Sequence, residues 1–401
     1  MPLASTSLTQ LRYIAETVAG TTPTTGNAIN LRMTGESLDF GVQTETSKEI
    51  RSDRQTTDVI QVGASCSGGF NFELSFKEYD PFIEALLQGT WNDYGTNGKG
   101  AALALGINST AGTLTASAAP TGNDAFSRIT VGQWIRLKAP SDAADGAYIK
   151  VASVTSTVIT ADTATPIPGT GTRAAVAGCV ISASRLSNGA NQRYFTLEKH
   201  FSDVNQYLAY RGMSPSKMSL NFESGAIVTG NMDFIGFNAS KMLTTTTLPG
   251  TPVVSQTYDV MNAVSGVGQL LERGVDMQSQ GTFIKSLKFD FDNSLRGQTA
   301  IGTLGFVGVA GGTINVGGSM TIYLKDASAY NRFIDNEATS ISWRMKDLAG
   351  NAYVLTLPKV RFTSGKVVAG AINQDAILEM PFMALLDGTS QRTMFIDRLA
   401  A

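Results

Sequence analysis

An internal repeat is the feature of this sequence that most restricts its fold. Residues 249 positions apart match in the same order in both halves of the chain: Leu38 and Phe40 match Leu287 and Phe289, and Gly68-Gly69 match Gly317-Gly318. In each half a segment with helical spacing follows the glycine pair. Self-similarity of this kind indicates one structural unit encoded twice. The sequence therefore predicts a tandem duplicated fold.

The matching segments alternate between apolar and polar residues, as half-buried β-strands do. The clearest examples are residues 38–42, 70–76 and 287–292. Many similar runs follow, separated by turns rich in the chain's 41 glycines. We therefore expect a mainly β fold, a β-sandwich or barrel flanked by short helices.

Three short helices are predicted, over residues 80–89, 326–334 and 203–210. In the first, Asp80 is the expected N-cap, Pro81 suits the first turn, and Gly89 can end the helix in the left-handed conformation. Asp326 is the expected cap of the second helix. Gly212 is expected to end the third.

A segment of different composition interrupts the first copy. Thr196-Leu197-Glu198-Lys199 resembles Thr356-Leu357-Pro358-Lys359, and this match makes the first copy longer than the second. The extra residues are rich in Ala, Thr, Gly and Ser and read as strands joined by turns. We expect three domains: residues 1–98 with 185–250, an inserted all-β domain at 99–184, and residues 251–401.

Charge and composition exclude several classes of protein. Charged residues make up only 16% of the chain, and 31 Lys and Arg against 33 Asp and Glu give a net charge of −2. Without a basic block, specific nucleic-acid binding is disfavoured, whereas DNA can still pass a neutral or acidic wall. The sequence has no secretory signal and no apolar run long enough for a membrane anchor, so we expect folding in the cytoplasm.

The candidate catalytic patterns fail on spacing. His200 is the one histidine, too few for a His-based metal site, and we expect it to be structural. Residues 63–69 lack the G-x-S-x-G spacing of a nucleophile elbow, and residues 95–100 lack the Ser or Thr of a phosphate loop. Asp290 and Asp292 lack the rest of a calcium loop. We expect no enzyme activity, no cofactor and no metal.

Several segments resemble the tail tube proteins of siphophages, the long-tailed bacteriophages. They are residues 11–16 and 31–38, the loop 48–55 followed by 62–64 and 72–75, and, in the second half, 284–287 and 292–296. The resemblance implies a β-sandwich with a flanking helix and a long hairpin or loop, and six such units around a channel. Two units in one chain would then give a trimeric ring with pseudo-sixfold symmetry, and the insert would lie outside as a decoration.

The resemblance also implies a place and partners. The protein would be a structural component of the virion, assembled in the host bacterial cytoplasm into stacked rings that form the tail tube. Its partners would be other copies of itself, a tape-measure protein, and terminator and baseplate proteins. Viral DNA would pass through the tube without specific binding.

Two sets of charged residues are candidate sites within this framework. The loop 44–61 is expected either to be simply solvated or to contact the next ring; its charged residues are Glu45, Lys48, Glu49, Arg51, Asp53, Arg54 and Asp58. Asp290 and Asp292 share one strand face, which either lines an acidic channel or is a solvated outer face. An N-terminal arm, residues 1–34, is also expected to contribute to stacking.

Two alternative functions remain. The same fold serves in proteins that form a single ring, a tail terminator or a baseplate or distal tail protein. A carbohydrate-binding β-module, acting through Trp134 and Tyr148 of the insert, is the other alternative.

Overall fold

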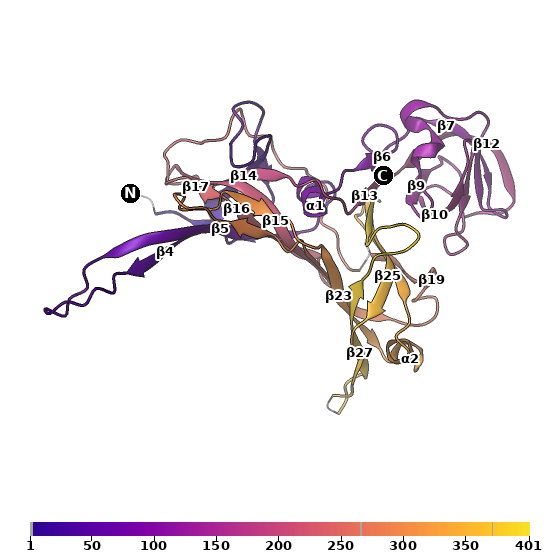
Figure 1. Ribbon diagram of the computed structural model, residues 1–401. Coiled ribbons are helices and arrows are strands. Elements are labelled where there is room, and N and C mark those ends of the chain that lie inside the picture. Colours follow the sequence, from indigo (N-terminus) through magenta and orange to yellow (C-terminus); the bar gives the residue numbers. More distant parts are fainter. Residues whose placement is uncertain (1–2, 265–266, 371) are drawn as a thin grey trace.

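The computed structural model describes residues 3–264, 267–370 and 372–401. Within these residues the chain consists mainly of β-strands, with two short α-helices. The strands form an extended sheet system through most of the molecule, and a separate closed barrel lies at one end (Figure 1). The predicted mainly β fold class is therefore confirmed.

The first half is a curved sheet with a helix packed against it. Its elements are β1 (Thr9–Glu16), β2 (Ile29–Leu31), β3 (Gly35–Glu36), β4 (Asp39–Thr46), β5 (Val59–Glu73), α1 (Asp80–Leu86), β6 (Asn92–Asp93), β13 (Ser184–Ser187), β14 (Tyr194–Phe201), β15 (Gln206–Glu223), β16 (Thr229–Gly236) and β17 (Asn238–Ala239). The alternation expected for 70–76 extends to residue 73, with Phe70 and Phe72 buried and Asn71 exposed between them. Leu11 and Tyr13 of β1 are buried in the same core, so the predicted N-terminal arm is wrong: residues 9–16 belong to the body of the fold.

The second half is built from elements in a similar order. They are β18 (Val267–Glu272), β19 (Val275–Asp276), β20 (Ile284–Asp292), β21 (Arg296–Gln298), β22 (Gly308–Ala310), β23 (Asn315–Tyr323), α2 (Ser328–Ile334), β24 (Thr339–Lys346), β25 (Ala352–Phe362), β26 (Lys366–Val368), β27 (Ile377–Ala384) and β28 (Phe395–Leu399). The buried residues of both halves form one continuous hydrophobic core.

The same strand pairings occur in both halves. In the first half β1 pairs with β14, β4 with β5, β5 with β16, β14 with β15, and β15 with β16. In the second half β18 pairs with β24, β20 with β23, β23 with β27, β24 with β25, and β25 with β27. These pairings align β14 with β24, so the sequence match of residues 196–199 with 356–359 joined strands that are not equivalent.

Glycines at matching points of β5 and β23 allow a neighbouring backbone to approach closely. A Cβ atom on Gly68 would lie 2.1 Å from the carbonyl oxygen of Ser37, and one on Gly318 would lie 1.9 Å from that of Lys288. Gly68 faces Phe234 across the sheet and Gly318 faces Phe382. The structural counterpart of Gly68 is therefore Gly318, one position later than the constant sequence offset indicated.

The two halves are joined through their sheets. The end of β15 pairs antiparallel with β20, from Lys217 opposite Asp292 to Glu223 opposite Ser286. One face of this continuous sheet carries the apolar core residues and the other carries polar ones, as the alternating burial of β16 and β20 shows.

The residues between β6 and β13 form a closed barrel with its own core. Its strands are β7 (Leu103–Asn108), β8 (Thr113–Ala116), β9 (Trp134–Lys138), β10 (Ala147–Val154), β11 (Val158–Ala161) and β12 (Thr172–Ser182), in the order β10-β11-β8-β7-β12-β9. Its core is a cluster of buried residues separate from that of the two halves.

The helices differ from expectation in their ends. Asp80 is not the cap of α1 but lies inside its first turn, with Pro81 at the start of the helix, and the left-handed residue after it is Gln88 rather than Gly89. Asp326 does accept a hydrogen bond from the backbone N–H of Ser328 at 2.9 Å at the start of α2. The helix expected over 203–210 is wrong, because residues from 206 onward belong to β15 and pair with β14.

Candidate assembly surfaces

The β4–β5 hairpin is the most prominent projection of the molecule (Figure 1). Residues 42–46 and 59–62 are exposed on both faces of this ribbon, and its strands pair only with each other there. The predicted loop 44–61 is thus the outer part of this hairpin: residues 44–46 and 59–61 are paired strands, and residues 47–58 connect them. An extended chain rises about 3.3 Å per residue, so the tip at Asp53 lies at most about 33 Å from Gly63.

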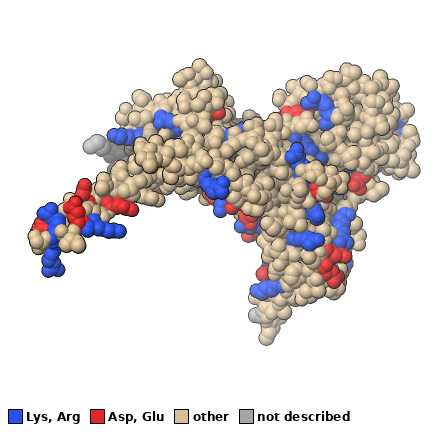
Figure 2. Space-filling view, in the orientation of Figure 1, with Lys and Arg blue, Asp and Glu red and all other residues tan. Residues whose placement is uncertain are grey.

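The charged residues predicted as a contact site all lie on this hairpin and are all exposed. Figure 2 shows acidic and basic side chains gathered at its tip, whereas most of that face of the molecule is uncharged. Arg51 and Asp53 form an ion pair at 2.8 Å. The hydrogen bond from Arg51 lowers the pKa of the Asp53 carboxyl. Ile50 lies among these charges and is fully exposed, at 102% of its reference area.

Asp290 and Asp292 lie on the polar face of the continuous sheet, as the alternation of β20 predicts. Each aspartate has a lysine partner: Lys288 lies 2.8 Å from Asp290, and Lys217 lies 3.1 Å from Asp292. This part of the face therefore carries paired charges of both signs rather than acidic groups alone.

Among the strand edges that lack a neighbour in the described part of the chain, those of β4 and β26 lie at opposite ends of the sheet order. β4 pairs only with β5 on one side, and β26 pairs only with β27. An unpaired edge presents backbone N–H and C=O groups that another strand can satisfy. These edges have counterparts within the chain, because β20, the equivalent of β4, is paired with β15.

A buried charged cluster, which sequence reasoning missed, fixes the barrel against the two halves. Asp397 in β28 is fully buried and accepts hydrogen bonds from Arg185 Nε and Nη2, both at 2.7 Å, and from the backbone N–H of Trp134 at 3.0 Å. Next to it, Arg398 pairs with Asp80 and Asp93. The sequence signal was an acidic and a basic residue inside the apolar C-terminal run 395–399, but their partners lie far away in the sequence.

Tyr353 extends this cluster toward α1. Its hydroxyl donates to Asp80, and burial together with the Asp80 charge raises the tyrosine pKa well above its usual value. Asp80, predicted as a helix cap, thus serves as the acceptor that links α1 to β25 and β28.

The aromatic residues that suggested a carbohydrate site are covered by the chain itself. Trp134 is fully buried and packs with Leu271, Val354 and Leu399. The Tyr148 hydroxyl donates to the carbonyl of Gly350 at 2.6 Å, and the ring lies against Arg344. Both residues hold the barrel to the second half, which argues against that alternative.

The residues weighed for catalysis occupy structural positions. His200 stacks on Tyr207, and its Nδ1 lies 3.0 Å from the Arg12 guanidinium. Burial raises the pKa of the Cys66 thiol to about 12, which keeps it protonated. Within the described residues there is no group of three or more His, Cys, Asp or Glu that could hold a metal ion. No described helix is long and apolar enough to cross a membrane.

A comparison with known families finds a match that covers most of the chain. The family model described as phage tail tube protein matches residues 6–384. The chain belongs to the phage tail tube protein family. It is therefore a structural component of a phage tail, which confirms the family inferred from the sequence segments. Among curated proteins, none matches this chain.

The exposed surfaces of the chain fit a structural protein of the tail tube family better than they fit an enzyme. The hairpin, the unpaired edges and the polar sheet face are extended features suited to contacts between molecules. The deep clusters, by contrast, have their polar groups paired within the chain, as the Arg185–Asp397 pair at 2.7 Å illustrates.

Proposed function

We propose that this tail tube protein closes into rings of three chains, and that the rings stack into a conduit for DNA ejection. The observation that carries the proposal is the β15·β20 junction, which joins the two halves within one chain. An equivalent junction between molecules would satisfy the free edges of β4 and β26.

The repeated pairings indicate which strands would meet. β20 corresponds to β4, since each is paired with the strand that precedes a helix. β15 corresponds to β25 with its continuation β26, since each pairs with the strand before it, β14 or β24, and with the strand that follows it: β15 with β16, and β25 and β26 with β27. Pairing of β26 in one chain with β4 in the next would repeat the internal junction around an axis. With two units per chain, three chains complete six units.

This proposal includes the division of the chain into residues 1–98 with 185–250, 99–184 and 251–401. The barrel of the middle segment lies at the end of the molecule remote from the hairpin (Figure 1). In a ring closed through β4 and β26 it would be an external decoration, outside the sheet that surrounds the channel.

The polar sheet face would line the channel, since the helices and the core lie on the other face. Paired charges such as Lys288–Asp290 give this face little net attraction for phosphate. DNA would then pass without specific binding. Tape-measure, terminator and baseplate proteins would set the length and the ends of the stack.

Electron microscopy of the purified protein in negative stain tests the function. Tubes or stacked rings support the proposal. Isolated rings that do not stack at any concentration would support the single-ring alternative. A protein that stays monomeric at high concentration would contradict both.

A further inference from the structure

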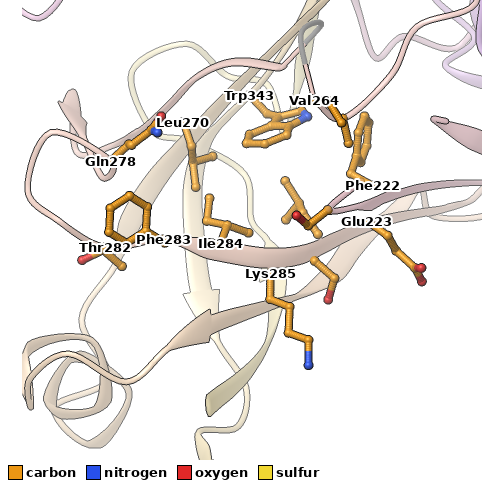
Figure 3. Close-up of a pocket in the computed structure, with 14 residues that line it drawn as sticks. Phe222, Glu223, Val264, Leu270, Gln278, Thr282, Phe283, Ile284, Lys285 and Trp343 are labelled. Atoms are coloured by element: carbon orange, nitrogen blue, oxygen red, sulfur yellow. The ribbon is translucent and has the colours of Figure 1, made fainter. Parts of the chain in front are cut away.

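A cavity lies at the end of the sheet opposite the hairpin. Its volume is about 200 Å³, and the apolar part of its lining includes Phe222, Leu270, Phe283, Ile284 and Trp343. These side chains come from the end of β15 and from three parts of the second half, and they surround the cavity in Figure 3. Phe283 is 53% exposed, and Val264 on the opposite side of the cavity is 70% exposed, so apolar surface is open to an incoming side chain.

Strand directions place this cavity at the opposite end from the hairpin tip. β5 starts at the hairpin and pairs antiparallel with β16, and β16 pairs antiparallel with β15. β5 and β15 therefore run in the same direction, and β15 ends at Glu223, beside the cavity. Head-to-tail stacking along these strands would bring the hairpin of one ring to the cavity end of the next.

The hairpin tip and the cavity are complementary in chemistry. Ile50 is a fully exposed apolar side chain flanked in the sequence by one acid and one base, Glu49 and Arg51. The cavity combines apolar walls with polar groups such as Gln278 and Thr282, and it is flanked by one acid and one base, Glu223 and Lys285, which point away from it in Figure 3. Opposite charges around an apolar contact fix orientation and register.

The cavity also holds an unused hydrogen-bond donor. Trp343 is 5% exposed, and its Nε1 has no hydrogen-bond partner among the described residues. Buried indole N–H groups usually find an acceptor. A small shift of the ring on docking would let Nε1 donate to a backbone carbonyl of the incoming hairpin.

We propose that the β4–β5 hairpin tip of one chain docks in this cavity of a second copy in the adjacent ring, with Ile50 as its apolar anchor. The inference rests on the proposed function and names the receptor for the hairpin. Each chain then offers one tip and one cavity, so the contact repeats without closing and produces an open-ended stack.

Disulfide trapping tests the contact directly. The variant Ile50→Cys with Phe283→Cys, assembled into tubes and then oxidised, is expected to give a ladder of covalent oligomers on a non-reducing gel. Cys66 and Cys179 are buried and free and will not contribute. The matched control is Ile301→Cys with Phe283→Cys, because Ile301 is equally exposed, at 107%, but lies in a different loop.

Ile50→Asp gives a second, independent readout. Losing one buried isoleucine contact is expected to raise the critical concentration for tube growth by about ten- to a hundredfold, while rings still form. Tubes that assemble normally from Ile50→Asp, or a tested pair that links no faster than the control pair, would overturn the docking proposal while leaving the tube function standing. Failure of the unmodified protein to form tubes would overturn both.

Discussion

The buried pair of Arg185 and Asp397 offers the sharpest prediction about what holds the barrel in place. Asp397→Ala removes an acceptor of three hydrogen bonds and leaves the Arg185 guanidinium, with 9% of its side chain exposed, without its counter-ion. Breaking a buried ion pair by removing one partner costs about 3–5 kcal/mol. Arg185 keeps bonds to Thr130 and Gly132, so we expect the lower part of that range, about 3 kcal/mol.

Urea unfolding of the unassembled protein measures this loss. The matched control is Asp290→Ala, which breaks the pair with Lys288, where the aspartate side chain is 50% exposed. An exposed pair contributes about 0–1 kcal/mol, so the control should unfold close to the original protein. Hydrogen exchange in β9 should also rise in Asp397→Ala, because Trp134 loses its acceptor.

The double variant Arg185→Met with Asp397→Leu separates a lost charge from lost packing. Replacing a buried pair by apolar residues of similar volume is often neutral or stabilising, so it should recover most of the loss. If Asp397→Ala unfolds within about 1 kcal/mol of Asp290→Ala, the cluster does not hold the barrel and the reasoning is refuted.

Three further predictions concern assembly, ejection and pH. Deleting residues 46–56 should leave a folded protein that no longer polymerises, as followed by circular dichroism and microscopy; normal tubes would contradict it. Changing Asp290 and Asp292 to Lys should slow DNA ejection if they face the channel. An unchanged ejection rate would show that they do not face it. Burial and the nearby Arg12 lower the pKa of His200 in the folded protein. The unfolded chain therefore binds a proton at this histidine more readily than the folded chain does. The free energy of unfolding should be highest above pH 6.5 and should fall as the pH drops below 6.5. The variant His200→Gln should lack this pH dependence of the unfolding free energy, which is at most about 1.4 kcal/mol per pH unit. Identical profiles of stability against pH for the two proteins would contradict the prediction.

The repeat and the fold class were readable from the sequence because alternation is a local signal. Leu38, Phe70 and Leu287 are buried as their patterns required. The exact register was not readable: glycines occur in adjacent pairs, and only the pairing of Gly68 with Phe234 and of Gly318 with Phe382 shows which glycines correspond. The helix expected at 203–210 failed because pairing with β14 overrides local preference.

The charged sites were likewise predictable from the sequence only in part. The charged hairpin was predicted because a dense run of charge is visible in a chain that is otherwise poor in charge. The buried cluster was not, because Asp397 and Arg185 are 212 positions apart and only the folded chain brings them together. The lysine partner of Asp292 is likewise supplied by a different strand, β15, so an acidic face became a paired one.

An averaged end-on image of an assembled ring tests the central claim most directly, since it counts chains and units together. Two copies of one module per chain predict three chains, each contributing two similar lobes to the channel wall, with the barrels outside. Six chains around the axis, or a wall in which the two halves of a chain occupy dissimilar positions, would contradict the account.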